Sequence, residues 1–148
     1  MNFRKADTND IPCLVEFRKQ QLLDEGLAPV NNIDRELAEW FAESLSDGSL
    51  ISWLAVDGDK IVASSGVCLF KFPPVYSAPN GQLAYITNMY TLPEYRKQGI
   101  GSHLLGLVIN EAKVLDCKRF LLHASADGRP LYEKAGFADA DGFMSMRL

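Results

Sequence analysis

The sequence has few of the residues that would support a metal site, a disulfide framework or a membrane span. Its 148 residues include three cysteines and two histidines. Cys13, Cys68 and Cys117 are odd in number and lack C-x-x-C spacing, so neither zinc ligation nor disulfides are predicted. No apolar run is long enough to cross a bilayer, and the first ten residues lack the apolar stretch of a secretory signal. We therefore expect a cytoplasmic protein with reduced thiols, no bound metal and no membrane partner.

Positive charge is also scarce. The chain carries 15 lysines and arginines against 19 aspartates and glutamates, a formal net charge of −4. Nucleic-acid binding requires a basic face, so this balance argues against a nucleic-acid partner. In an acidic chain, the two adjacent cations Arg96 and Lys97 are a local feature that needs an explanation.

We predict one domain over residues 1–148, because no repeat, low-complexity segment or linker divides the chain. Hydrophobic periodicity then indicates its helices and strands. The predicted element order is β-α-α-β-β-β-α-β-α-β-β, an α/β architecture with a mixed sheet. The expected helices cover residues 8–26, 31–49, 99–115 and 127–137, and the expected strands cover 2–6, 50–56, 61–70, 82–92 and 118–124. A last hairpin is predicted over 137–148, with its turn at 139–142.

The stretch Arg96–Ser102, RKQGIGS, predicts an anion-binding loop. The first N–H groups of a helix have no intrahelical acceptor and therefore bind phosphate well. Gly99 and Gly101 let the backbone approach an anion closely, and Ser102 adds a hydroxyl donor. The alternative is a tight turn into a helix, with its cations solvated.

Counting residues disfavours two other phosphate motifs. A dinucleotide-binding fingerprint needs a third glycine three residues after Gly101, where this chain has Leu104. A P-loop needs Gly-Lys-Ser/Thr after four spacer residues, and that sequence is absent.

Two segments together resemble the GNAT N-acetyltransferase superfamily. The sequence Arg96-Lys97-Gln98-Gly99-Ile100-Gly101 is similar to the family's Arg/Gln-x-x-Gly-x-Gly/Ala motif, and Leu131–Phe137, LYEKAGF, is similar to its later motif. The resemblance implies a mostly antiparallel central sheet flanked by helices, with a splayed strand pair that holds the cofactor. Asn88 is the position at which we expect the strand bulge that opens this pair.

The resemblance also implies acetyl-CoA as cosubstrate. Its pantetheine arm would pair with the backbone of one strand, and its pyrophosphate would sit on the N–H groups of the loop. The implied strand residues are Met89, Tyr90 and Thr91, and the implied loop residues are Arg96, Lys97, Gln98, Gly99, Ile100, Gly101 and Ser102.

The implied reaction moves an acetyl group directly from the thioester to an amine. Tyr132 matches the tyrosine that often protonates the leaving thiolate, although a tyrosine packed under its helix is the alternative role. The family often places a glutamate base near the position of Tyr85, and its absence leaves ordered water or solvent to take the amine proton. His123 could face the slot or pack as a surface histidine.

The acceptor is expected between the first two helices and the late hairpin, as a small-molecule or protein amine. Asp24, Glu25 and Asp34 could attract a cationic amine there, and the loop 71–81 could overhang it. A longer acyl-CoA donor and a non-catalytic acyl-CoA-binding sensor remain alternatives. The pattern is also compatible with a homodimer.

Overall fold

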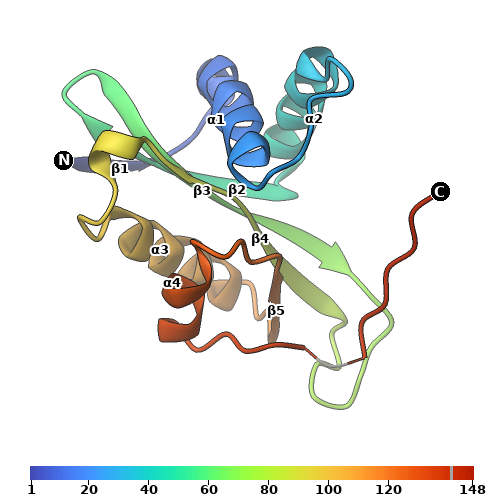
Figure 1. Cartoon of the computed structure of the whole chain (residues 1–148). Coiled ribbons are helices and arrows are strands. Elements are labelled where there is room, and N and C mark those ends of the chain that lie inside the picture. The colour runs from blue at the N-terminus through green and yellow to red at the C-terminus, as the bar shows by residue number, and fades with distance from the viewer. Residues whose placement is uncertain (141) are drawn as a thin grey trace.

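The computed structural model describes residues 1–140 and 142–148 (Figure 1). Its elements follow one another as β1 (Asn2–Lys5), η1 (Thr8–Asp10), α1 (Ile11–Asp24), α2 (Asp34–Asp47), β2 (Leu50–Asp57), β3 (Lys60–Lys71), β4 (Gln82–Thr91), η2 (Pro93–Tyr95), α3 (Ile100–Val114), β5 (Arg119–Leu122) and α4 (Arg129–Lys134). The predicted helices and the first five predicted strands are present, with shifts of a few residues at their ends.

The strands form one five-stranded sheet in the order β1-β2-β3-β4-β5. The first three pairings are antiparallel, and β4 pairs with β5 in parallel through the α3 crossover. The sheet is therefore mixed and mostly antiparallel, as predicted. β2 and β3 meet at a two-residue turn in which Gly58 has φ 60°, a conformation that glycine adopts without strain.

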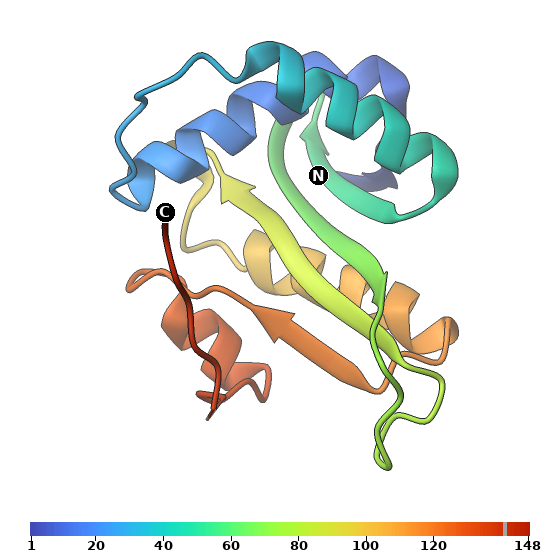
Figure 2. The ribbon, with the colours of Figure 1, turned by 90° about the vertical axis from the view of Figure 1, so that its right-hand side faces the viewer.

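Helices cover both faces of the sheet (Figures 1 and 2). One face packs against α1 and α2 through a core that includes Leu14, Phe41 and Leu54. The opposite face packs against α3 and α4, with Leu105 and Val108 at the centre of that core. The ends of β4 and β5 lie between these two helical layers.

The sheet splits at the end of β4. Ser64 pairs with Tyr90 and Gly66 with Thr87, so β4 carries one residue more than β3 between these pairs. Asn88 lies in this bulge with φ 53°, and its carbonyl accepts a hydrogen bond of 2.9 Å from the Ser64 hydroxyl. The predicted bulge position is thus confirmed. The pairing of β4 with β5 ends at Ile86 and Leu122, so the bulged end of β4 continues without a partner on that side.

The predicted final hairpin is wrong. Asp141, in its predicted turn, lies outside the described residues, and the described residues after α4 form no strand. A strand forms where a neighbouring strand supplies hydrogen bonds and other residues bury its apolar side chains. Residues 142–148 have exposed side chains and no such neighbour in the described part of the chain. β5 is therefore an edge strand in the described part of the chain.

Candidate functional site

A cavity of about 620 Å³ lies where β4 and β5 separate. Its walls come from the end of α1, the end of β4, the loop before α3, the residues after β5 and the start of α4. It contains Tyr132 and all of the predicted cofactor residues except Gln98, namely Met89, Tyr90, Thr91, Arg96, Lys97, Gly99, Ile100, Gly101 and Ser102. The Gln98 side chain instead donates to the carbonyl of Glu94 at 3.2 Å. Segments that are far apart in the sequence therefore meet at one site.

The loop before α3 has the backbone of an anion site. Gly99 precedes the helix with φ 81°, and Lys97 also adopts a left-handed conformation with φ 61°. The N–H groups of Ile100, Gly101 and Ser102 belong to the first helical turn, so they have no intrahelical acceptor. Among the described residues no side chain caps these groups. The loop can therefore offer several N–H groups and a positive helix end to a phosphate.

Arg96 connects this loop to both sides of the cavity. Its Nε donates to the carbonyl of Thr91 at 2.9 Å, which ties the loop to the end of β4. One terminal nitrogen lies 2.9 Å from a carboxylate oxygen of Asp24 at the end of α1, and the guanidinium lies 5.6 Å from the Tyr90 ring centroid. The Asp24–Arg96 pair thus joins α1 to the loop across the cavity.

Tyr132 is buried in the core between the sheet and the α3–α4 layer. Burial, followed by the negative charge of Glu25 and the neighbouring Tyr85, raises the pKa of its hydroxyl to about 12. At neutral pH the hydroxyl is protonated and can donate a hydrogen bond to an anion in the cavity. Its ring centroid lies 6.2 Å from that of Phe137, so the side chain has a packing contact and also lines the cavity.

The candidate bases fall into two groups. Tyr85 is half-buried on β4, and burial raises its pKa, so it is not a base at neutral pH. His123 lines the cavity. His103 instead packs against Phe3 with ring centroids 4.1 Å apart, and Glu94 pairs with Lys60 at 2.9 Å. Of these groups, only His123 borders the cavity, and the Glu25 carboxylate borders it as well.

Glu25 ends a short polar chain along α1. A guanidinium nitrogen of Arg18 donates to the Gln21 side-chain oxygen at 3.1 Å, and the Gln21 amide donates to Glu25 at 3.2 Å. The negative charge of Glu25 contributes to the raised pKa values of both Tyr85 and Tyr132. Glu25 therefore lies within electrostatic range of both Tyr85 and Tyr132.

Several further cavity residues were not predicted, among them Gln21, Ser125 and Asp127. The four-residue spacing of Gln21 and Glu25 could have predicted that the two side chains share one polar face of the helix. Ser125 accepts a hydrogen bond of 3.1 Å from the N–H of Gly128 and so shapes the start of α4. No sequence pattern marked Ser125 or Asp127, because their position depends on the loop that follows β5.

Part of the predicted acceptor region is located elsewhere. Asp34 pairs with Lys19 at 3.0 Å and does not line the cavity. The loop 71–81 is closed by an isolated bridge between Val75 and Ala78 and also contributes no lining residue. Within the described residues, Phe137–Ala140 line a separate hollow beside β5 and not this cavity.

The described part of the chain contains no group of three or more histidine, cysteine, aspartate or glutamate side chains placed to hold a metal ion. None of its helices is long and apolar enough to cross a membrane.

Comparison with known proteins identifies this arrangement. Residues 17–137 match the model of the acetyltransferase (GNAT) family. The chain belongs to the GNAT family. The crystal structure of a predicted acetyltransferase with acetyl-CoA from Clostridium acetobutylicum superposes with a TM-score of 0.95 at 42% identity, covering 99% of this chain and 95% of that one. This GNAT chain therefore shares its whole described fold with a protein seen with acetyl-CoA.

Two relatives of this GNAT chain have named substrates. Thialysine N-epsilon-acetyltransferase of Sus scrofa is 32% identical over 140 residues, which is 77% of this chain and 81% of the relative. An aminoglycoside N(6′)-acetyltransferase type 1 of Acinetobacter genomosp. 13 is 28% identical over 74 residues, or 48% of this chain and 51% of the relative. The prediction of an N-acetyltransferase enzyme is confirmed by the family and by these relatives.

Proposed function

We propose that this GNAT enzyme transfers an acetyl group from acetyl-CoA to a primary amine of a small cationic molecule. The observation that carries the proposal is the one cavity that is lined by the RKQGIGS loop, the bulged end of β4 and Tyr132. The same cavity has cations from the loop and carboxylates from α1 and from the segment after β5, which suits an anionic donor and a cationic acceptor.

For the donor, the loop and the splayed strand supply complementary features. The free N–H groups of the first turn of α3, with Lys97 beside them, suit a pyrophosphate. The backbone of Met89, Tyr90 and Thr91 beyond the bulge is unpaired on the β5 side, so it can pair with the amides of a pantetheine arm. The relative that was crystallised with acetyl-CoA supports this donor.

The chemistry follows from these placements. The neutral amine nitrogen attacks the thioester carbonyl carbon, the nitrogen loses a proton to water, the C–S bond breaks, and an amide and a thiolate of CoA result. A strand N–H near Met89 or Tyr90 would stabilise the negative charge that develops on the carbonyl oxygen. Tyr132 would donate its hydroxyl hydrogen bond to the thiolate. Since its pKa of about 12 lies above the thiol's reference value of about 8.5, we expect stabilisation of the anion to precede any full proton transfer.

For the acceptor, we propose that Glu25 binds the ammonium group. It lines the cavity at the end of α1, and Gln21 holds one of its oxygens, which leaves the other free for a ligand. An ammonium bound there must lose a proton before it attacks, and water or His123 would take it. The printed substrates of the two relatives, thialysine and aminoglycosides, are both amines, which supports this class.

The deciding experiment measures CoA release from acetyl-CoA over a panel of amines, with a no-amine control. The panel should contain diamines, lysine analogues, aminoglycosides and a peptide with a free N-terminus. We expect acetyl-CoA to raise the melting temperature and at least one cationic small amine to accelerate CoA release. If acetyl-CoA does not stabilise the protein, the proposal is wrong. Binding of acetyl-CoA without acceleration by any amine would favour the acyl-CoA-binding sensor.

A further inference from the structure

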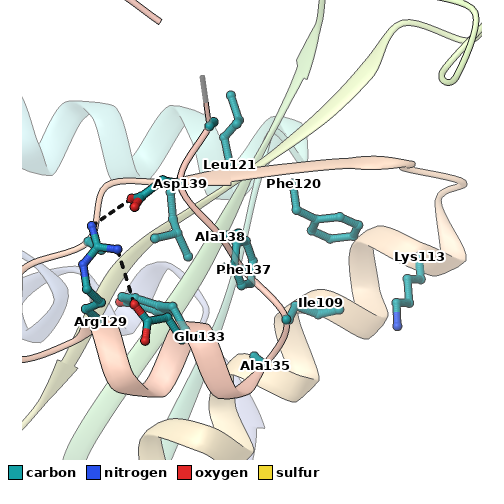
Figure 3. Close-up of a pocket in the computed structure, with 15 residues that line it drawn as sticks. Ile109, Lys113, Phe120, Leu121, Arg129, Glu133, Ala135, Phe137, Ala138 and Asp139 are labelled. Atoms are coloured by element: carbon teal, nitrogen blue, oxygen red, sulfur yellow. Dashed lines mark hydrogen bonds and ion pairs between the residues drawn. The ribbon is translucent and has the colours of Figure 1, made fainter. Parts of the chain in front are cut away.

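Arg18 is a half-buried arginine of α1 whose guanidinium makes no ion pair with a carboxylate of the described residues. One of its terminal nitrogens donates instead to the neutral side-chain oxygen of Gln21 at 3.1 Å. By contrast, Arg129 of α4 lies against two carboxylates, those of Glu133 and Asp139 (Figure 3). A guanidinium has five N–H donors and binds a carboxylate through two parallel hydrogen bonds. Arg18 therefore retains donors that fit a carboxylate.

Two ionisable groups of the sheet lie within electrostatic range of Arg18, and both are neutral. The positive charge of Arg18 acts on the pKa values of Cys68 on β3 and Tyr85 on β4. Burial nevertheless raises the pKa of Cys68 to about 11 and also raises the pKa of Tyr85. Neither side chain is an anion at neutral pH, so neither compensates the charge of Arg18.

Gln21 bridges Arg18 and Glu25 and keeps their charges apart. Its oxygen accepts from Arg18, and its amide nitrogen donates to a carboxylate oxygen of Glu25 at 3.2 Å. The three side chains follow one face of α1 over about two turns. Two hydrogen bonds and one amide group keep the bonded nitrogen of Arg18 within about 9 Å of the bonded oxygen of Glu25. A cation and an anion at this separation complement a ligand that carries opposite charges at its two ends.

The anionic end of this arrangement lies at the cavity, and the cationic end lies next to it. Glu25 and Gln21 line the cavity, whereas Arg18, one helical turn earlier, does not. α1 packs over β4 (Figure 2), and Tyr85 belongs to the core on that side of the sheet. A ligand that extends from Glu25 to Arg18 would therefore lie along α1 and leave the cavity beside β4.

We propose that Arg18 binds a carboxylate of the acceptor, and that the acceptor is an amino acid with a terminal amine. This inference rests on the proposed function, which places the reacting ammonium group at Glu25. A chain of the length of lysine, lying along α1, brings its carboxylate to Arg18 while its terminal ammonium stays at Glu25. A polyamine without a carboxylate would instead bring a second cation toward Arg18, and like charges repel.

The test measures binding by titration calorimetry in the presence of CoA, which has no acetyl group and therefore allows no turnover. The ligands are lysine and lysinamide, in which an amide replaces the carboxylate. We expect lysine to bind about tenfold to hundredfold more tightly than lysinamide, the range of a charge-assisted hydrogen bond. Arg18→Gln should remove this preference by weakening the binding of lysine, without weakening the binding of lysinamide.

The matched control is Lys19→Gln, which removes one positive charge at the next position of α1. The Lys19 amine pairs with Glu16 and Asp34 outside the cavity, so this variant should keep the preference for lysine. Arg18→Lys keeps the charge but not the pair of parallel donors, and it should keep only part of the preference. Diaminopropionate, whose terminal amine is closer to its carboxylate, should bind no more tightly than its amide.

The inference is wrong if lysine binds no more tightly than lysinamide, if lysine does not bind, or if Arg18→Gln weakens both ligands equally. The last result would mean that Arg18 only positions Gln21 and Glu25. If Arg18→Gln fails to unfold cooperatively, Arg18→Lys decides, and an undiminished preference in that variant overturns the inference.

CoA release from acetyl-CoA judges the proposed function separately. Acceleration by amines without any preference for a carboxylate would support the proposed enzyme and reject the role of Arg18. A preference for lysine in binding that depends on Arg18, without acceleration by any amine, would support the carboxylate site and reject the proposed enzyme.

Discussion

The proposed donor side and the proposed acceptor side of the cavity are built in different ways. The donor side consists of backbone: the first turn of α3, the left-handed Gly99 and the bulged end of β4. The acceptor side consists of side chains that come from the end of α1 and the loop after β5, among them Glu25 and Asp127. A backbone site needs particular glycines at a particular spacing, whereas a side-chain site needs only that distant segments meet.

This difference explains why enzymes with one donor can differ in their acceptors. Changing Glu25 leaves the loop geometry intact, because no hydrogen bond joins Glu25 to residues 96–102. One polar contact that connects the two sides is the ion pair between Asp24 and Arg96. Variants that affect one side alone are therefore the direct way to test the division.

The largest expected effect is on the donor side. Gly99→Asp places a negative charge where we expect the pyrophosphate and strains a residue with φ 81°. We expect acetyl-CoA affinity to fall at least about hundredfold, a loss of roughly 2.7 kcal/mol, measured by titration calorimetry.

The matched control is Gly48→Asp at the end of α2, where φ is 77° and the space around the residue is equally open. It carries the same backbone strain far from the cavity and should leave acetyl-CoA affinity unchanged. Equal losses in both variants would mean that strain, and not the phosphate site, is responsible.

The next effect concerns the reaction step between the two sides. Tyr132→Phe removes the hydroxyl and keeps the ring that packs near Phe137. We expect kcat to fall about 10²-fold with little change in acetyl-CoA affinity, as is usual for loss of a general acid. Tyr76→Phe, at a fully exposed position in the 71–81 loop, is the control.

The pH profile offers a second reading of Tyr132. Its pKa of about 12 means that the hydroxyl keeps its proton above pH 10, where an ordinary tyrosine would lose it. We therefore expect that ionisation of Tyr132 does not lower the kcat of the unmodified enzyme near pH 10. A fall in kcat near pH 10 that is absent from Tyr132→Phe would show that the hydroxyl titrates normally and is not buried in the working enzyme.

A smaller effect is expected on the acceptor side. Glu25→Gln keeps the size of the side chain and removes its charge, so KM for the best amine should rise about tenfold to hundredfold, the range of one charge-assisted hydrogen bond. Acetyl-CoA affinity should not change. Asp34→Asn removes a carboxylate that is paired with Lys19 outside the cavity, and it should leave KM unchanged. A rise in KM for both variants would indicate a general field effect of the acidic helices.

The two sides also differ in how far sequence alone could predict them. Residues 96–102 and Leu131–Phe137 are local motifs, and the donor loop, the bulge at Asn88 and the position of Tyr132 in one cavity followed from them. Gln98 was the exception, because its side chain donates a hydrogen bond to the Glu94 carbonyl, and the motif does not predict this bond. Gln21 and Asp127 were missed because their place depends on tertiary packing.

The hairpin predicted over residues 137–148 was wrong for a different reason. A turn sequence at 139–142 between apolar residues is a local signal. Whether strands form beside it depends on a neighbouring strand, and the described residues after α4 form no strand.

The smallest expected effect is at the contact that joins the two sides. Asp24 and Arg96 are each exposed by about two-fifths, and an exposed pair of this kind contributes about 0–1 kcal/mol to stability. Asp24→Asn should therefore change the free energy of unfolding by less than about 1 kcal/mol. It also releases the Arg96 guanidinium, which stays attached to the Thr91 carbonyl, for interaction with a phosphate. We expect acetyl-CoA affinity to rise by a small factor that disappears at high salt, because the interaction of exposed charges is screened. A fall in affinity would mean that the pair positions the loop, and the two sides of the cavity would then be coupled.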